Sequence, residues 1–387
     1  MNSNEESPTG GVAFISFCDS GGMLHYVAGL QREIASHTRS LLVLVGNGSS
    51  PADLRFLLSS NRLVNRLLEK YNPAYYRCLA RKLLDECKPS VVHITSSSIG
   101  LPFFIKQLQR GGAKVVYTVH DPDPHEEARS VWSRLMMRIE NLANERALRL
   151  CDRIHVHSAL HEKRLNERYD NVFSRKIYVS QHGCGITDAI IQGNRVPQEL
   201  RDFPCGSDAL VLLFFGRIEP YKGLDVLFDA LASGGFSRRV VMIVAGHGNI
   251  PQPSSPLNAE LISINRFVDD SEIQFLFNLA DVVVLPYVSA TQTGVIPLAY
   301  AFARPVIATK VGALPELVDD GATGFLVQGS DPEALRRSIE CFAGDNDLAR
   351  RMGEKALSYL DNRFGWSEIT ARHLKQYESM TAGTTLG

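Results

Sequence analysis

The segment FFGRIEPYKG at 214–223 places two cations five residues apart. Gly216 ends an apolar run, and Arg217 and Lys222 follow it. Arginine binds phosphate oxygens as a planar fork and lysine binds them as a point charge, so the pair is suited to hold a diphosphate. Two solvated charges on a surface loop would show the same short pattern. A second anion site in the sequence favours the first interpretation.

That second site lies in VVVLPYVSATQTGVIPLA at 282–299. An apolar run stops at Pro286, a loop of small and hydroxyl residues follows, and an apolar helix is predicted from Val295. The free N–H groups and the positive dipole end of a helix N-terminus bind anions. We therefore expect Gln292, Thr293 and Gly294, with Val295, to form an anion site, although Thr293 could also act as a simple N-cap.

A histidine and a glycine pair complete the candidate chemistry. His120 follows the apolar run 115–119 and begins the loop HDPDPH, where an imidazole can orient a substrate hydroxyl or transfer a proton. It could equally cap the strand by bonding to the loop backbone. Gly21 and Gly22 follow the first apolar run and would let backbone approach phosphates closely, or would simply form a tight turn.

Short apolar runs that would position these residues recur along the chain. They are rich in Val, Ile and Phe and lack alternation, as expected of strands buried on both faces. Helical patterns separate them, for example at 129–150 and 331–342. This alternation predicts parallel sheets, and a stretch rich in Gly and Pro at 190–208 divides them into two sets and predicts a hinge. The predicted strands are 12–17, 41–45, 91–94, 115–119, 154–157 and 177–179, then 210–215, 240–245, 262–264, 282–285, 306–308 and 325–327.

The expected fold class is therefore α/β, with two tandem Rossmann-like domains that face each other across a cleft. Ligands bind at the carboxyl ends of the strands in such sheets. A nicotinamide dehydrogenase would share this outline, but no GxGxxG motif follows any predicted strand.

The order of several motifs resembles a known family. GRIEPYKG is followed by VAGHG at 244–248, NRFVDD at 265–270, ADVVVLPY at 280–287 and RPVIATKVGALPELVDDGATGFLV at 304–327, and FGW at 364–366 precedes a last helix. This order resembles retaining glycosyltransferases of family 4, which have the GT-B fold. The loop Thr291–Gly294 is similar to a TQSG-like subgroup, since the places of the family's paired glutamates read Ala290 and Leu298.

The resemblance implies that the two domains bind different substrates. Residues 1–192 would bind the acceptor, residues 193–365 would bind a nucleotide-diphosphate sugar, and a helix at about 366–387 would pack back onto the first domain. It gives His120, Arg217 and Lys222 catalytic roles. The donor-binding residues that it implies are Gly21, Gly22, Arg217, Lys222, Gly246, Arg266, Gln292, Thr293, Gly294 and Val295. It implies no cofactor and no metal, because cations and helix dipoles would stabilise the departing diphosphate.

The function implied is transfer of a hexose from a nucleotide sugar to a glycan or lipid-linked acceptor with retained configuration, in cell-surface polysaccharide synthesis. Two alternatives stay open. A sugar-nucleotide epimerase of the same fold would turn over its substrate without an acceptor. A non-catalytic relative would bind a nucleotide and release none from any donor.

Charge and composition limit the kinds of partner that the chain is expected to bind. Residues 1–195 carry 25 Lys and Arg against 19 Asp and Glu, and the remainder carries 16 against 23, which indicates different partners for the two halves and no general nucleic-acid binder. Seven scattered cysteines and a polar N-terminus favour a cytoplasmic protein.

The stretch 55–88 holds eight basic and three acidic residues with leucines at helical spacing, followed by Tyr71, Tyr75 and Tyr76. It could lie on an anionic membrane surface at the cytoplasmic face, or it could be a solvated face over core leucines.

Overall fold

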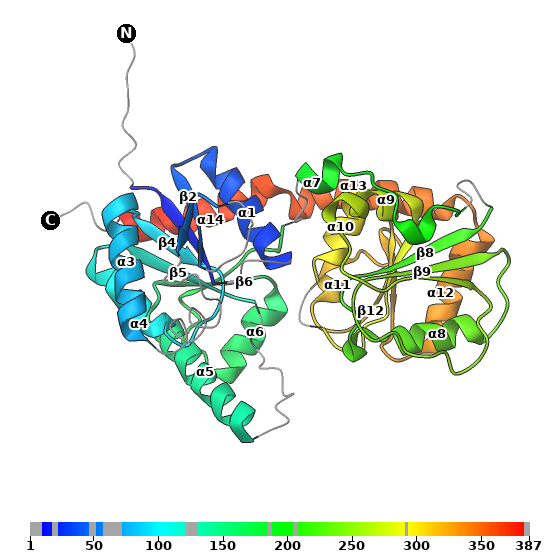
Figure 1. Cartoon of the computed structure of the whole chain (residues 1–387), viewed down its shortest axis with the longest axis horizontal. Helices are drawn as coiled ribbons and strands as arrows, with labels where there is room; N and C mark the ends of the chain where they lie inside the picture. Colours follow the sequence, from blue (N-terminus) through cyan, green and yellow to red (C-terminus); the bar gives the residue numbers. More distant parts are fainter. Residues whose placement is uncertain are drawn as a thin grey trace, which may run out of the picture. The chain divides into compact units, whose positions relative to one another are not determined.

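A computed structural model of the chain describes residues 10–17, 22–45, 52–56, 72–120, 122, 131–183, 188–203, 208–290 and 293–382. The chain divides into two compact units. Unit 1 comprises Met1–His182 with Trp366–Gly387, and unit 2 comprises Gly183–Gly365. Each unit is a parallel sheet with helices against it (Figure 1).

The sheet of unit 1 has seven strands, all parallel, in the order β3-β2-β1-β4-β5-β6-β7. The strands are β1 (Val12–Ser16), β2 (Ser40–Val45), β3 (Leu54–Phe56), β4 (Val91–Ile94), β5 (Lys114–Val119), β6 (Arg153–Val156) and β7 (Ile177–Val179). The helices are α1 (Gly22–Ala35), α3 (Pro73–Cys87), α4 (Leu101–Arg110), α5 (Val131–Leu150), α6 (Ala159–Arg168) and α14 (Trp366–Thr381).

Each face of this sheet has its own apolar core. One core joins alternate strand residues such as Ile15 and Val92 to α3, α4 and α5. The other joins Phe14 and its neighbours to α1 and α14. The two helices α1 and α14 pack closely together, and Trp366 lies against Gly29, where an added Cβ would come within 2.5 Å of the indole. The last helix of the chain is thus part of unit 1.

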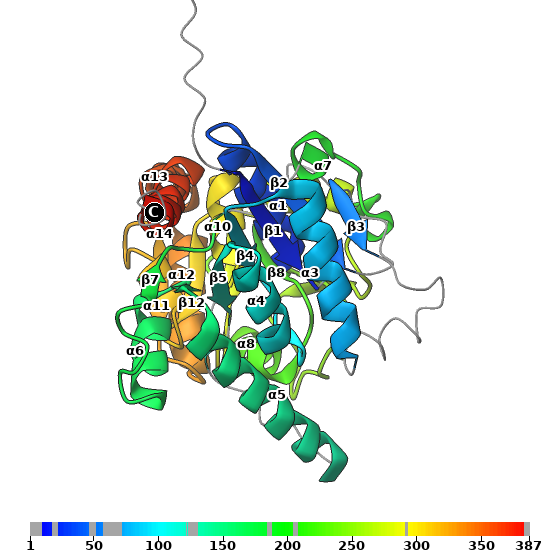
Figure 2. The ribbon, with the colours of Figure 1, turned by 90° about the vertical axis from the view of Figure 1, so that its left-hand side faces the viewer.

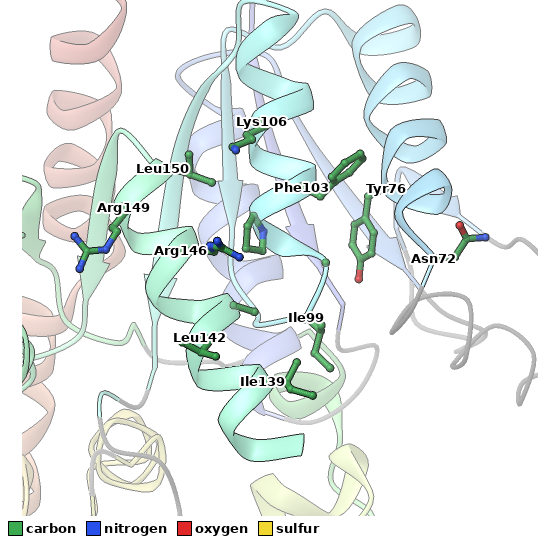
Figure 3. Close-up of a pocket in the computed structure, with 13 residues that line it drawn as sticks. Asn72, Tyr76, Ile99, Phe103, Lys106, Ile139, Leu142, Arg146, Arg149 and Leu150 are labelled. Carbon is green, nitrogen blue, oxygen red and sulfur yellow. The ribbon is translucent and has the colours of Figure 1, made fainter. Parts of the chain in front are cut away.

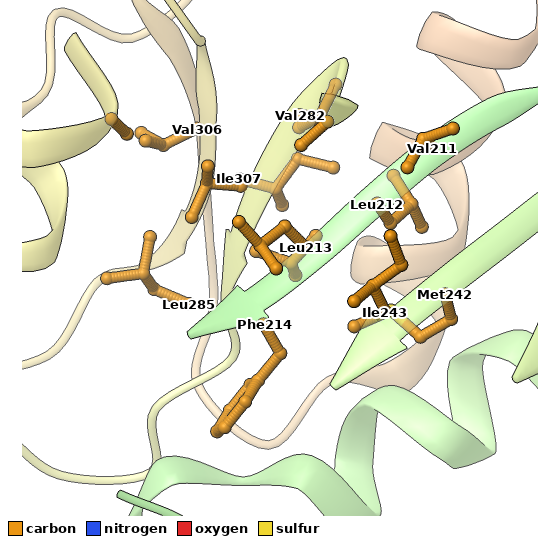
Figure 4. Packing of buried hydrophobic residues seen from close by; sticks show 14 of the residues in the cluster. Val211, Leu212, Leu213, Phe214, Met242, Ile243, Val282, Leu285, Val306 and Ile307 are labelled. Atoms are coloured by element: carbon orange, nitrogen blue, oxygen red, sulfur yellow. The ribbon is translucent and has the colours of Figure 1, made fainter. Parts of the chain in front are cut away.

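Unit 2 has a six-stranded parallel sheet in the order β10-β9-β8-β11-β12-β13. The strands are β8 (Leu210–Phe215), β9 (Val240–Ala245), β10 (Glu260–Ile264), β11 (Val282–Leu285), β12 (Val306–Thr309) and β13 (Gly324–Val327). Figure 4 shows Leu213, Ile243 and Val282 among the side chains of its core. The helices are α7 (Asp188–Gln192), η1 (Gln198–Leu200), η2 (Pro220–Lys222), α8 (Leu224–Ala232), α9 (Asp270–Leu279), α10 (Val295–Ala301), α11 (Leu314–Leu317), α12 (Pro332–Gly344) and α13 (Leu348–Phe364).

The two Rossmann-like domains of the predicted fold class are confirmed, and each of the twelve predicted strands has a counterpart. Only β3 was not predicted. It has three residues, and Arg55 interrupts its apolar pattern at the edge of the sheet.

The expected boundary at 192/193 and hinge at 190–208 do not match the division of the chain, which passes from unit 1 to unit 2 at His182/Gly183. Ile190 of α7 and Leu200 of η1 are buried in the core of unit 2. Arg195 and Glu199 form ion pairs with Glu272 and Arg266 of that unit. These contacts fix the stretch to unit 2, although its Gly and Pro content indicated a linker.

The basic stretch 55–88 falls partly outside the described residues, since 57–71 are not among them. Its described helix α3 buries Tyr75, Tyr76, Leu79 and Leu83 in the core of unit 1. These aromatic and leucine side chains are therefore core residues and not membrane contacts. Among the helices that the structure describes, none combines the length and apolarity that crossing a membrane requires.

Candidate active site

The carboxyl ends of β8 and β9 are joined by close backbone contacts. The Gly216 N–H donates to Ala245 O at 2.9 Å, and the Ile218 N–H donates to His247 O at 2.9 Å. Gly246 has a φ of 155°, and an added Cβ would lie 1.9 Å from Gly216 O. Only glycine fits this approach, so the structure gives Gly246 a packing role at the site expected to bind the donor.

Lys222 lies buried above this edge of the sheet. It is the last residue of η2, and Gly223 follows with a φ of 65°. Its Nζ lies 3.0 Å from the position of a Cβ added to Gly216 and 5.4 Å from the centroid of the Tyr287 ring. Burial is the main cause that lowers the pKa of Lys222 to about 8, and the charge of Arg217 acts in the same direction. An anion bound beside the ammonium would raise this pKa again.

Arg217 is exposed on the same loop. Among the residues that the structure describes, neither Arg217 nor Lys222 forms an ion pair with a carboxylate. Two cations that repel each other, with no carboxylate at ion-pair distance among the described residues and only the charge of Glu219 partly offsetting the repulsion, form a site for a dianionic group. The structure thus brings these two predicted residues together at the carboxyl edge of the sheet.

The loop after β11 is tied to the loop that carries Lys222. The N–H groups of Val288 and Ser289 donate to Tyr221 O at 2.8 and 3.3 Å. The Thr293 side chain is hydrogen-bonded to Tyr287, whose pKa is raised chiefly by burial. Tyr287, which this hydrogen bond joins to Thr293, is the aromatic ring beside the Lys222 ammonium.

The helix N-terminus predicted as an anion site is weaker than expected. α10 has only seven residues, the Val295 N–H donates to Thr293 Oγ1 at 3.2 Å, and Pro297 has no N–H. Thr293 is buried and acts as a local cap, and Gly294 is the N-cap residue without a side chain. Gln292 and Gly21 lie outside the described residues. Leu298, at the place of the second family glutamate, is buried among the apolar residues of unit 2.

The contacts of Arg266 do not support its expected donor-binding role. Its guanidinium donates to both carboxylate oxygens of Glu199 at 3.0 Å and to those of Glu272 at 2.7 and 3.0 Å, and its Nη1 also reaches Phe267 O. All five N–H groups are used. Burial alone would raise the pKa of Glu272, but hydrogen bonds from Arg266 and Arg195 lower it. Arg266 therefore fixes η1 to the start of α9.

In unit 1, His120 stands half-buried after β5. Its Nε2–H donates to Thr95 O at 2.5 Å, which leaves Nδ1 as an acceptor for the His157 Nε2–H at 2.8 Å. Desolvation is the main cause that lowers the pKa of His120 to about 3. Both ring nitrogens are engaged within the protein, so this geometry does not support the expected bond to a substrate hydroxyl. Gly22 begins α1 in the same unit.

His120 belongs to a larger buried histidine network. Tyr377 O–H donates to His93 Nδ1 at 2.6 Å, and the His93 Nε2–H donates to Thr118 Oγ1 at 2.6 Å. Thr118 in turn donates to His155 Nδ1 at 3.0 Å, and the His155 Nε2–H donates to Ser180 O at 3.0 Å. Each imidazole is one donor and one acceptor, which requires the neutral form. Desolvation lowers the pKa of His93 and His155 accordingly.

Sequence reasoning missed this network. The letters VVHI and IHVH show histidines inside predicted strands, which is the available signal, since a buried histidine needs polar partners. The partners themselves come from distant parts of the chain, such as Tyr377 of α14, and no local sequence pattern predicts them.

Comparisons with known proteins agree with this architecture in both units. Residues 20–184 match the family described as Glycosyltransferase Family 4, and residues 209–345 match the family described as Glycosyl transferases group 1. Each of the two domains is thus similar to a glycosyltransferase domain, and the class that the fold and these matches support is a GT-B glycosyltransferase.

Among curated relatives, a D-inositol 3-phosphate glycosyltransferase of Streptomyces scabiei is 38% identical over 185 residues, which are 44% of this chain and 41% of that protein. The chain thus matches well under half the length of that relative.

Two solved structures share the fold over the whole chain. Sucrose-phosphate synthase from Thermosynechococcus elongatus has a TM-score of 0.71 at 19% identity, and covers 96% of this chain and 99% of its own. Anabaena HepE in complex with UDP and glucose has a TM-score of 0.69 at 19% identity, and covers 95% and 99%. At this identity the likeness concerns the fold.

Proposed function

We propose that this protein transfers a hexose from a nucleoside-diphosphate sugar to a hydroxyl of a glycan or glycolipid acceptor, with retention of anomeric configuration. The observation that carries the proposal is the pair Arg217 and Lys222, two cations without a carboxylate partner among the described residues, at the carboxyl edge of the unit 2 sheet. The HepE structure, which holds UDP on the same fold, supports a uridine nucleotide as the first probe.

In the proposed reaction the bond between the anomeric carbon and the diphosphate oxygen breaks, and the bond to the acceptor oxygen forms. Charge develops on the leaving diphosphate, where Lys222 and Arg217 would stabilise it. The acceptor hydroxyl proton leaves with the diphosphate, so that atoms and charges balance. We propose that the reaction needs neither metal nor cofactor. Full activity after dialysis against EDTA is the expected result, and loss of activity that Mg²⁺ restores would contradict it.

The acceptor and the cellular setting are also proposals. We place the enzyme in the cytoplasm, at the cytoplasmic face of a membrane, in cell-surface polysaccharide synthesis. The name of the Streptomyces relative gives a phosphorylated inositol as the molecule that it glycosylates, so an acceptor panel should include phosphorylated polyols beside glycans and glycolipids. An epimerase would convert a nucleotide sugar without any of these acceptors, and a non-catalytic relative would convert none.

The decisive experiment measures the thermal stability of the chain with UDP, GDP and ADP and with their sugars. A ligand at about 100 times its Kd adds roughly 2.7 kcal/mol to the free energy of unfolding. We expect one base family to stabilise the wild type, and Lys222→Met and Arg217→Ala to lose most of that gain. Arg337→Ala changes an exposed arginine of unit 2 and is the control. If no nucleotide stabilises the wild type, or if the control loses the gain equally, the proposed site is wrong.

The pH dependence of UDP binding tests the role of Lys222 separately. Because its pKa is about 8 in the free protein, the ammonium loses its proton above that pH, and the UDP dissociation constant should then rise toward tenfold per pH unit. Lys222→Arg stays charged and should bind UDP with little change between pH 7 and 9. An equal pH dependence in both proteins would exclude Lys222 as the titrating group.

A further inference from the structure

A groove of about 780 Å³ opens among the helices that cover one face of the unit 1 sheet. It lies between α4 and α5 and reaches the start of α3, as Figure 3 shows. Its apolar lining includes Tyr76, Phe103, Ile99 and Leu142. Neither the sheet edge nor the diphosphate site uses this groove, so it needs an explanation of its own.

The groove carries an unbalanced positive charge. Lys106, Arg146 and Arg149 line it, and no lining residue is acidic. Arg149 donates to Glu145 at 2.7 Å, but Lys106 and Arg146 form no ion pair within the part of the chain that the structure describes. Arg77 adds a further cation, 5.8 Å from the Phe103 ring centroid. The occupant of this groove must therefore be both apolar and anionic.

Helix α5 continues this surface beyond the groove. Leu135, Ile139 and Leu142 are 47%, 38% and 63% exposed, and their spacing of four and three residues puts them on one helix face. Figures 1 and 2 show the start of α5 extending away from the sheet of unit 1. Single exposed aliphatic side chains are common, but a row of three beside cations indicates a binding surface.

We propose that this row and the groove, which we call the α5 surface, bind the chains and phosphates of an anionic membrane. Aliphatic side chains enter the acyl region while Lys106 and Arg146 contact lipid phosphates, as basic amphipathic helices do. A nucleic acid would satisfy the cations but leave three aliphatic side chains in water, since bases stack on aromatic groups. The segment 57–71 of the chain carries Arg62, Arg66 and Lys70 against Glu69, so its charge does not complement the surface.

The proposal goes beyond the proposed reaction, because docking requires neither the nucleotide nor the transfer. It places the membrane contact on α4 and α5, and Tyr76 at the start of α3 borders the groove. Glycosyl transfer to a lipid-linked acceptor would gain from such docking, but the test reads lipid binding alone.

Co-sedimentation of the full chain with vesicles tests the α5 surface. We expect binding to vesicles of phosphatidylcholine mixed with phosphatidylglycerol and none to phosphatidylcholine alone. Each basic residue at an anionic surface contributes about fivefold in affinity, so Lys106→Gln with Arg146→Gln should weaken binding by roughly 20-fold. The control pair Arg372→Gln with Lys375→Gln removes the same charge from α14, on the opposite face of the sheet, and should change binding little.

The double change Leu135→Gln with Leu142→Gln tests the apolar part of the α5 surface and should weaken vesicle binding at least tenfold. Leu357→Gln on α13 changes another exposed leucine and is the control. The gain in thermal stability with UDP should stay unchanged in every variant, which separates this proposal from the proposed reaction. Absence of wild-type binding, or equal losses in variants and controls, would overturn the proposal. So would a leucine variant that dissociates an oligomer in sedimentation analysis while it binds vesicles normally, because a second copy would then cover the surface.

Discussion

At the scale of single residues, two arginines of unit 2 show how partners decide a role. Arg217 is exposed and has no carboxylate partner among the described residues, whereas Arg266 uses all five N–H groups within the protein. Both follow strands at the same edge of the sheet, so the sequence alone assigns them alike. Only a free guanidinium can bind a diphosphate.

Arg266→Ala should lower the free energy of unfolding of the protein without weakening UDP binding. The Glu272 side chain is 2% exposed and would keep Arg195 and the Asp269 N–H as partners, and Arg266 itself is 35% exposed. Removing one partner of a buried ion pair costs 3–5 kcal/mol, and solvent reduces this to about 2 kcal/mol here. Chemical denaturation and UDP titration measure the two quantities. Weaker UDP binding at unchanged stability would restore the expected donor-binding role.

At the scale of elements, the loops after β8 and β11 are joined by the two hydrogen bonds to Tyr221 O and by a close backbone contact at Gly223. Gly223 has a φ of 65°, and a Cβ there would lie 2.1 Å from Pro286 O. The contact orients η2 and therefore Lys222, which precedes Gly223. Backbone carbonyls cannot move aside as a flexible side chain can, so this glycine has no substitute.

Gly223→Ala should destabilise unit 2 by roughly 2–4 kcal/mol, the sum of left-handed strain and overpacking, and should also weaken UDP binding. Gly321→Ala is a matched control, since Gly321 has a φ of 80° but nothing within 4 Å of an added Cβ. It should cost about 1 kcal/mol of strain alone and leave UDP binding intact. Equal effects of the two changes in thermal melts would show that the contact with Pro286 is unimportant.

The elements also show what the sequence can predict. Strands such as 210–215 and 240–245 are continuous apolar runs because both faces of a parallel sheet are buried, and this pattern is local. The role of Arg266 depends on Glu199, 67 residues away, and that of His93 on Tyr377, 284 residues away. The pattern near Val295 predicted a helix start correctly, but not that α10 ends after seven residues. The sequence did not predict the distant partners of Arg266 and His93, nor the end of helix α10.

At the scale of the whole molecule, the titratable groups of the two units differ. Unit 1 contains ten of the eleven histidines, and unit 2 contains only His247. Desolvation is the main cause that lowers the pKa of five buried or half-buried histidines of unit 1, namely His93, His120, His155, His157 and His373. In unit 2 the ion pairs of Arg266 and Arg195 instead lower the pKa of carboxyl groups such as Glu199 and Glu272.

The two units should therefore lose stability in different pH windows. A histidine that is neutral in the fold but protonated in the unfolded chain lowers the free energy of unfolding as pH falls below about 6.5, by up to 1.4 kcal/mol per pH unit. Five such groups would remove on the order of 5 kcal/mol by pH 5.5, which is comparable to the stability of a domain. Protonation would also put a hydrogen on Nδ1 of His93 and of His155, which accept from Tyr377 and Thr118 in the fold, and would disrupt these two hydrogen bonds.

Unit 2 should unfold only below about pH 4.5, since a carboxyl group with a lowered pKa loses its stabilising effect when it is protonated. Differential scanning calorimetry between pH 7.5 and 4 should show one transition that moves down from pH 6.5 and a second that stays until pH 4.5. Proteolysis at pH 5.5 should cut unit 1 and spare unit 2. His247→Gln should leave both transitions in place, whereas His373→Gln should reduce the acid dependence of the first by about a fifth, since it removes one of the five histidines. A first transition independent of pH above 5 would mean that the histidines of unit 1 can accept protons without opening the fold.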